Sequence, residues 1–253
     1  MRAVIVIPAR LGSTRLPGKA LLSETGRPVL QHVFEGCTGV RGAPRVIIAT
    51  DDARIAECAS SFGAEVRMTS PHHPSGSDRV AEVAAALTED VIINVQGDEV
   101  EIRSQELESL LVALEEDEEA SIATLAVPIK DEETWRNPNV VKVVVDARGR
   151  AMYFSRSPIP HGAGRRFAPG SSEDAFEPLK HRGVYAFRRE ALLRWARLEP
   201  VPLERAEKLE QLRALHHSLK IQVVSTPHDG IEVNTREDYD RFVARQRFSR
   251  GSG

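Results

Sequence analysis

Residues 3–19 read AVIVIPARLGSTRLPGK, and this stretch decides the predicted fold. It opens with a short apolar run, 3–9, rich in the Val and Ile of a buried strand. The loop that follows carries two glycines, two hydroxyl side chains and the cations Arg10, Arg15 and Lys19. Exposed backbone N–H groups beside positive charge favour a phosphate-rich ligand. A solvated loop with unrelated charges is the alternative, because the stretch is neither a GxGxxG nor a Walker motif.

Apolar runs and helical patterns alternate through the first half of the chain. Such alternation predicts an α/β fold with a doubly wound, mixed and mainly parallel sheet. The helix over 77–87 is expected to be capped by Ser77 or Asp78, and Asp52 to cap the helix that follows it. Strands are expected at 3–9, 45–51, 65–69 and 90–99, and helices at 27–37, 52–63 and 77–87.

The rhythm changes in the second half. Residues 140–156 read as two strands around an Ala-Arg-Gly turn, which predicts a hairpin. Residues 160–178 are rich in Gly, Pro, Ser and charge, which is typical of a mobile loop. We expect one domain over 1–250, with 130–200 as an inserted sub-region. The other expected elements are strands at 181–187, 221–227 and 231–235, a strong helix at 203–219, and a last helix capped by Thr235.

Bulk composition excludes several classes of protein. The 253 residues carry a formal net charge of −3, which argues against general nucleic-acid or membrane-surface binding. No apolar run approaches the roughly 18 residues that a membrane span needs. Cys37 and Cys58 are the only cysteines and lack zinc spacing, so we expect a reduced, cytoplasmic protein.

Several acids lie where strands of the predicted sheet end, and ligands of open α/β sheets bind beyond those ends. Asp98 and Glu99 follow an apolar strand. They either cap a helix or pair with the basic loop, or they hold Mg²⁺ beside bound phosphate. Residues 72–79 predict a Gly turn that leads into a helix, and Arg79 at their end is expected to reach a ligand. His181 and Tyr185 lie four residues apart on a strand and should face the same side. A lone pair of this kind usually has a structural role.

Taken together, these segments resemble one family, the 3-deoxy-manno-octulosonate (Kdo) cytidylyltransferases, or CMP-Kdo synthetases. The similarity extends to about residue 240 and keeps the family order. The matching pieces are IPARLGSTRLPGKAL, ATDDARIAE, MTSPHHPSGSDRVAEV, NVQGDE, NPNVVKVV, AMYFSRSPIP, HRGVYAFR and EKLEQLRAL.

The resemblance implies a fold like that of nucleotide-diphospho-sugar transferases, with a smaller β-rich sub-domain for dimerisation and sugar binding. It also implies a homodimer and a magnesium-dependent reaction. In that reaction the anomeric hydroxyl of an acidic sugar attacks the α-phosphate of CTP, and pyrophosphate leaves. With Kdo as the sugar, the product serves lipopolysaccharide biosynthesis. Neither nucleic acid nor membrane is an implied partner.

The family's functional positions are carried over residue by residue. Arg10, Ser13, Arg15 and Lys19 would hold the triphosphate, and Lys19 would also lie near the sugar carboxylate. The residues implied as catalytic are Lys19, Arg10 and Asp98. Pro8, Ala9 and Arg79 would lie near the cytidine, Asp98 would bind magnesium, and Gln96, His181, Tyr185, Glu210 and Gln211 would bind the sugar.

Three departures from the family pattern concern the metal and the sugar. Asn234 stands where the family has a second magnesium-binding Asp, and an amide oxygen binds Mg²⁺ more weakly. Glu232, two residues earlier, is the hypothetical source of the missing charge. Val100 and Glu101 replace a Pro and an apolar residue, and Arg165 or Arg166 would substitute for an Arg after SPIP. Two alternatives follow: the same CTP chemistry on another sugar acid, or a weakly active nucleotide-binding homologue.

Overall fold

The computed structural model describes residues 1–12, 15–161 and 177–251. The chain divides into two compact units. The first unit is Met1–Glu108 with Gly230–Gly253, and the second unit is Ser109–Asp229. The predicted inserted region, 130–200, falls within the second unit, and the assignment of a single domain stays a prediction. The predicted loop over 160–178 and the substitute cations Arg165 and Arg166 lie largely or wholly outside the described residues.

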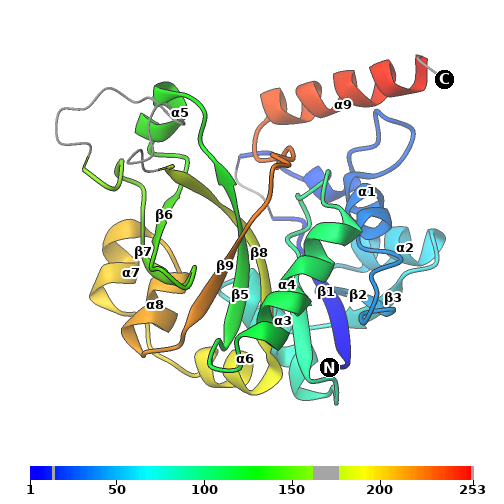
Figure 1. Ribbon diagram of the computed structural model, residues 1–253. Coiled ribbons are helices and arrows are strands. Elements are labelled where there is room, and N and C mark those ends of the chain that lie inside the picture. The colour runs from blue at the N-terminus through cyan, green and yellow to red at the C-terminus, as the bar shows by residue number, and fades with distance from the viewer. Residues whose placement is uncertain (13–14, 162–176, 252–253) are drawn as a thin grey trace. The chain divides into compact units, whose positions relative to one another are not determined.

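The first unit is built on a parallel sheet in the strand order β3-β2-β1-β4 (Figure 1). Every residue of β1 is buried, as the unbroken apolar run predicts. The predicted α/β pattern of this half is therefore confirmed. The strands are β1 (Ala3–Ala9), β2 (Val46–Thr50), β3 (Glu65–Met68) and β4 (Val91–Asn94).

Helices connect and cover these strands, and their caps fix where the loops begin. Asp52 accepts the N–H of Arg54 at 2.9 Å and caps α2, as predicted. The cap predicted for α3 is wrong, because the helix begins one residue earlier and Ser75 caps it. Thr235 caps α9 as expected. The helices of this unit are the 3-10 turn η1 (Lys19–Leu21), α1 (Val29–Gly36), α2 (Ala53–Ser61), α3 (Gly76–Ala85) and α9 (Arg236–Gly251), and α4 (Ser104–Glu116) begins in it.

The second unit has a mixed sheet. Strand β5 (Ile122–Pro128) lies between β8 (Leu179–Arg188), which is antiparallel to it, and β9 (Ile221–Ser225), which is parallel. The predicted hairpin is confirmed as β6 (Lys142–Val145) and β7 (Ala151–Ser155). Short helices join these strands: α5 (Glu132–Arg136), α6 (Arg189–Trp195), α7 (Pro202–Glu207) and α8 (Gln211–His216).

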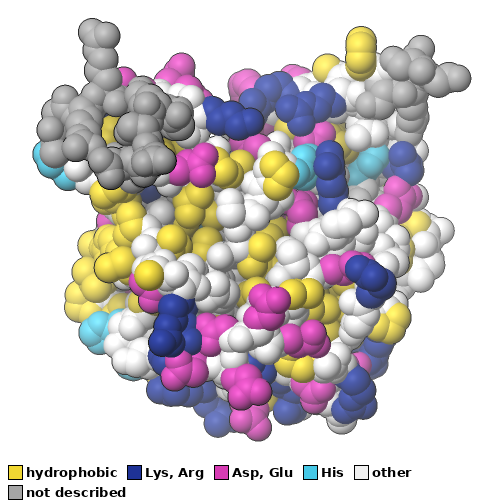
Figure 2. Space-filling model, in the orientation of Figure 1, with side chains coloured by type: hydrophobic (Ala, Val, Ile, Leu, Met, Phe, Trp, Pro, Cys, Tyr) yellow, Lys and Arg dark blue, Asp and Glu magenta, His cyan; other side chains and the backbone are white. Residues whose placement is uncertain are grey.

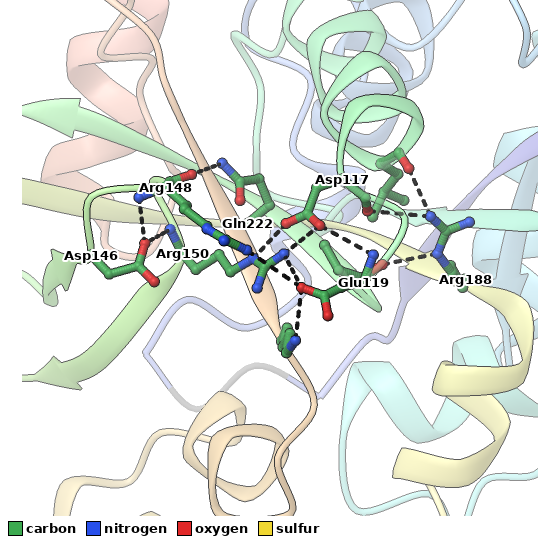
Figure 3. Close-up of polar contacts among 10 residues, drawn as sticks. Asp117, Glu119, Asp146, Arg148, Arg150, Arg188 and Gln222 are labelled. Atoms are coloured by element: carbon green, nitrogen blue, oxygen red, sulfur yellow. Dashed lines mark hydrogen bonds and ion pairs between the residues drawn. The ribbon is translucent and has the colours of Figure 1, made fainter.

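A charged network holds the turn of the β6–β7 hairpin (Figure 3). The Arg150 guanidinium donates two hydrogen bonds of 2.6 Å to Asp117 and one of 2.7 Å to Glu119. The carboxylate of Asp146 accepts the backbone N–H groups of Arg148 and Arg150 within the turn itself. The hydrogen bonds that Arg150 donates to Asp117 and Glu119 raise the pKa of Arg150 further above its usual range. The turn is thus tied to the segment that follows α4.

The single helix predicted over 203–219 is wrong. Lys208 adopts a left-handed conformation, φ 55°, and ends α7 before α8 begins at Gln211. The break turns Leu209 into the core, where it is 6% exposed. It also leaves Glu207 bonded to the end of β7, where Ser155 Oγ donates to its carboxylate at 2.6 Å. The apolar residues of 203–219 follow helical spacing on both sides of Lys208, so the sequence pattern did not reveal the break.

The surface mixes charges of both signs. Figure 2 shows Lys and Arg side chains beside Asp and Glu side chains on the visible face. Within the described ranges, none of the helices has the length and apolar character to cross a membrane.

Candidate active site

A pocket of about 260 Å³ opens in the first unit, where β1 and β4 end. Its walls come from four stretches of chain: the loop after β1, the start of α3, the loop after β4, and the segment before α9. The residues that line it are Pro8, Ala9, Arg10, Gly12, Arg15, Lys19, Ala20, His73, Ser75, Gly76, Arg79, Gln96, Gly97, Asp98 and Asn234.

Two glycines let these loops approach closely. A Cβ on Gly97 would lie 3.1 Å from the carbonyl oxygen of Pro8, and one on Gly76 would lie 3.0 Å from Gln96 Oε1. Both distances are tighter than ordinary contacts, so a side chain at either position would push the walls apart. The loops after β1 and β4 therefore face each other across the pocket, as the carboxyl-end rule predicts.

Lys19 lies at the centre of the polar contacts in the pocket. Its ammonium pairs with Asp98 Oδ2 and donates to the carbonyl oxygen of Val233 at 3.1 Å. The side chains of Lys19 and Asp98 are only 18% and 14% exposed. Through these two contacts, Lys19 joins the end of the loop after β1 to the loop after β4 and to the segment before α9.

The segment before α9 belongs to residues 231–235, which were predicted to form a strand, and that prediction is wrong. The backbone is not paired in a sheet there. The N–H of Val233 instead donates to the carbonyl oxygen of Asp98 at 3.0 Å. Ile231 and Val233 are buried while Glu232 and Asn234 turn the other way, which keeps the alternation of a strand without its ladder.

The Glu232 carboxyl lies among other acids. Glu232 is exposed by its accessible surface, yet crowding of its carboxyl by protein atoms, and then the negative charges of Asp98 and Glu99, raise the pKa of Glu232 to about 7. A hydrogen bond with the side chain of Asn234 acts in the opposite direction. Glu232 and Asn234 therefore share a side, as their spacing predicts.

The oxygens around Asp98 suit a hard divalent cation. Asp98 Oδ1 is buried and has no hydrogen-bond partner in the described part of the chain. The Asn234 amide oxygen lines the same pocket and accepts a hydrogen bond from Arg15 at 2.8 Å. Mg²⁺ prefers such oxygen ligands and needs only one or two carboxylates beside substrate phosphates. Among the described residues, no three His, Cys, Asp or Glu side chains form a metal cluster.

The other predicted nucleotide-binding residues lie at the pocket, apart from Ser13, which is outside the described residues. Arg10 is exposed at the rim. Arg79 is only 3% exposed, and its guanidinium pairs with Asp51 at 3.1 Å and contacts Thr69. Arg79 therefore lines the pocket with its charge already balanced from the β2 side.

A short chain of side-chain amides orients Gln96. Its Nε2 donates to Asn94 Oδ1 at 3.2 Å, and Asn94 Nδ2 donates to Ser77 Oγ at 3.5 Å. Asn94 is fully buried, so its orientation is fixed by its neighbours. The remaining Gln96 oxygen therefore lies toward Gly76, at the pocket wall.

The four other sugar-binding candidates belong to the second unit. The rings of His181 and Tyr185 have centroids 5.4 Å apart, although four residues of a regular strand span about 13 Å. A register shift in β8 opposite Thr124 and Leu125 leaves Gly183 and Val184 as a bulge, which draws the rings together. The other two candidates, Glu210 and Gln211, lie at the start of α8.

His181 and Tyr185 are neutral in this setting. Burial lowers the pKa of His181 to about 3, and His181 Nε2 lies 3.0 Å from Thr124 Oγ1. Burial, assisted by the charge of Glu210, raises the pKa of Tyr185. Uncharged hydrogen-bonding groups next to aromatic rings suit the hydroxyl-bearing face of a sugar better than its carboxylate.

Sequence reasoning missed several pocket residues. His73 and Ser75 line the pocket just before α3, and His73 pairs with Glu82. Gly12, Ala20 and Gly97 were not singled out either. A signal existed for Ser75, because a Ser before Gly and an apolar helical pattern is a common N-cap. The carbonyl of Val233 carried no signal, since a backbone group looks alike at every position.

Comparisons with known proteins show which family the chain resembles. The cytidylyltransferase family profile matches residues 4–221. The chain is 45% identical to the 3-deoxy-manno-octulosonate cytidylyltransferase of Geobacter metallireducens, over 96% of this chain and 97% of the relative. It is 46% identical to the enzyme of that name from Marinobacter nauticus, over 96% and 97%.

Solved structures extend the comparison. A CMP:2-keto-3-deoxy-manno-octonic acid synthetase complexed with CTP matches with a TM-score of 0.89 and 40% identity, covering 98% of this chain and 100% of that one. A cytidylyltransferase from Leptospira borgpetersenii matches with a TM-score of 0.63 over 96% of this chain and 86% of that one. At 20% identity the second match speaks for the fold alone.

Proposed function

Because the chain belongs to the cytidylyltransferase family, we propose that it transfers the cytidylyl group of CTP to Kdo and releases pyrophosphate. The observation that carries this proposal is the contact of Lys19 with Asp98 inside a pocket that Arg10 and Arg15 also line. A cationic pocket in which Asp98 Oδ1 has no hydrogen-bond partner among the described residues matches a triphosphate and its counter-cation.

The reaction forms one bond and breaks one. The anomeric hydroxyl oxygen of the sugar acid attacks the α-phosphorus, and the bond from that phosphorus to the bridging oxygen of pyrophosphate breaks. The hydroxyl proton is released, and the negative charge that develops on pyrophosphate requires cations. Positioning and charge stabilisation supply most of the rate enhancement in such transfers.

The cations of the loop after β1 provide that stabilisation in our proposal. Arg10, Arg15 and Lys19 line the pocket and would hold the triphosphate. Lys19 would leave part of its contact with Asp98 as phosphate oxygens arrive. Pro8 and Ala9, at the end of β1, would lie beside the cytidine together with Arg79.

We further propose Mg²⁺ as the counter-cation. Asp98 would hold it together with the Asn234 amide, which lines the side of the pocket nearest α9, and Glu232 would add charge from beside Asn234. When bound, Mg²⁺ neutralises phosphate charge and polarises the attacking hydroxyl. Asp98 thus balances Lys19 through Oδ2 in the free enzyme, while Oδ1, which has no hydrogen-bond partner among the described residues, would be open to the cation.

The sugar side of the proposal rests on the resemblance and on the identity to the Kdo enzymes. Gln96 in the first unit, and His181, Tyr185, Glu210 and Gln211 in the second, keep their proposed role in binding the sugar. Use of Kdo would place the product in lipopolysaccharide biosynthesis. The homodimer and the cytoplasmic location stay predictions.

Pyrophosphate release tests the proposed function. With CTP, Kdo and Mg²⁺ we expect steady release that stops when Kdo is omitted and falls when UTP or ATP replaces CTP. N-acetylneuraminate is the comparison acid. Release with that acid alone would favour the alternative acceptor, whereas no release with either acid would contradict the proposed activity.

Asn234→Asp tests the metal side. Adding a carboxylate beside Asp98 should lower the Mg²⁺ concentration for half-maximal activity by about tenfold, because a charged oxygen binds Mg²⁺ more tightly than an amide. The measurement is a Mg²⁺ titration at saturating CTP. Asn139→Asp, which adds the same charge in an exposed loop of the second unit, is the control. An unchanged Mg²⁺ requirement and turnover would separate Asn234 from the metal.

A further inference from the structure

Glu101 follows the QGDE stretch and contacts the segment before α9. Its Oε2 accepts the backbone N–H of Ile231 at 2.9 Å and a hydrogen bond from the Arg245 guanidinium at 2.8 Å. The Glu101 side chain is only 14% exposed. A carboxylate that accepts a backbone N–H makes a charge-assisted hydrogen bond, about twice as strong as a neutral one.

The contact bears on a segment that lacks a sheet partner. Residues 231–234 form no strand, so their position depends on individual contacts. At Val233, the N–H donates to the Asp98 carbonyl at 3.0 Å and the carbonyl accepts from Lys19 at 3.1 Å. At Ile231, the N–H is held by Glu101. Glu232 lies between these two anchors.

We propose that Glu101 is a positioning residue that holds Glu232 and Asn234 against Asp98. The inference rests on the proposed function, because it gives those side chains their metal role. One anchor on each side of Glu232 fixes its backbone, and removing Glu101 releases one of them. Ligand-supporting contacts of this kind typically change metal affinity or activity by about 10- to 100-fold when lost.

Arg245 has a smaller part. Its side chain is 58% exposed, and exposed ion pairs contribute little. Its charge offsets the accumulation of acids near the site, where Asp98, Glu99 and Glu101 lie within four residues of sequence. The backbone contact to Ile231, rather than the ion pair, therefore carries the positioning.

Three variants separate these contributions. Glu101→Leu removes both contacts, Glu101→Gln keeps an acceptor for the Ile231 N–H, and Arg245→Met removes the ion pair while leaving the contact of Glu101 with Ile231. Glu108→Leu is the matched control, because Glu108 also accepts a backbone N–H and a guanidinium, both from Arg41, at 3.0 and 2.8 Å. Arg41 lies in the turn before β2 and does not line the pocket.

The first readout is binding of Mn²⁺ alone to the full-length protein, followed by loss of the free Mn²⁺ electron paramagnetic resonance signal. The second is the Mg²⁺ concentration for half-maximal pyrophosphate release, with kcat and KM measured separately. Glu101→Leu should weaken Mn²⁺ binding and raise the Mg²⁺ requirement by about tenfold or more. Glu101→Gln and Arg245→Met should stay within about threefold of the unsubstituted protein, and Glu108→Leu should match it.

Glu101→Leu that binds Mn²⁺ as well as the unsubstituted protein would overturn the proposal. Equal loss in Glu108→Leu would overturn it as well, since the effect would then be general destabilisation. An unsubstituted protein that binds Mn²⁺ but releases no pyrophosphate would contradict the proposed function alone, and the Mn²⁺ affinities would still decide the role of Glu101. An unsubstituted protein that binds no Mn²⁺ would contradict the positioning role directly.

Discussion

Replacing Lys19 with methionine is expected to lower kcat/KM for CTP by about 100- to 1,000-fold, the usual loss when a charge-stabilising donor is removed. The Lys19 ammonium lies in the pocket between the loops after β1 and β4. Methionine keeps much of the side-chain volume and removes the charge. Steady-state pyrophosphate release with varied CTP measures the effect.

Loss of the Lys19 charge also changes the electrostatics of the free enzyme. The positive charge of Lys19 lowers the pKa of Glu232, whereas the negative charge of Asp98 raises it. Without Lys19, the repulsion between the Asp98 and Glu232 carboxylates is no longer offset by that cation. CTP alone should therefore raise the melting temperature of the Lys19→Met protein less than that of the unsubstituted protein. Lys220→Met is the control, since Lys220 pairs with Glu119 at 3.0 Å in the second unit. Equal losses in both variants would point to stability and remove Lys19 from the site.

The part of the pocket formed where β1 and β4 end was largely predictable. Strand β1 is an unbroken apolar run, and β4 follows the same pattern. Once both are strands of a parallel sheet, their carboxyl ends must lie at one edge. Arg10, Lys19 and Asp98 then meet at one pocket for reasons that the sequence already contains.

The segment before α9 was not predictable in the same way. The contact of Glu101 with Ile231 joins residues 130 positions apart through a side chain and a backbone N–H. Such a contact cannot be recognised in the sequence, because hydrophobic periodicity reports only local helices and strands. The apolar-polar alternation led us to predict a strand at 231–235, but no local pattern shows whether a strand has a partner in a sheet.

The sugar-binding candidates show a second limit. A spacing of four residues places His181 and Tyr185 on one face but not in ring contact. The bulge at Gly183 and Val184 supplies the contact, and Gly183 within an otherwise regular strand was a usable signal. The break at Lys208 offered none, because a left-handed Lys is set by its surroundings rather than by propensity.

Asp98→Asn is expected to have the largest effect, a loss of kcat on the order of 1,000-fold. The substitution keeps the shape of the side chain. It removes the charge that pairs with Lys19 and the carboxylate oxygen, Oδ1, that has no hydrogen-bond partner among the described residues. Mn²⁺ affinity should fall with kcat, whereas stabilisation by CTP in the presence of a chelator should persist, because the loop after β1 keeps its cations.

Glu65→Gln is the control for Asp98→Asn. Glu65 is also a paired carboxylate of the first unit, held by Arg45 at 2.7 Å, but it does not line the pocket. If neutralising any paired acid disturbed the unit, Glu65→Gln would lower kcat as well, and the assignment of Asp98 would lose its support. If Asp98→Asn kept full Mn²⁺ affinity while losing turnover, Asp98 would act by orienting Lys19 instead. A joint fall of affinity and kcat in Asp98→Asn alone is the result that the unpartnered oxygen requires.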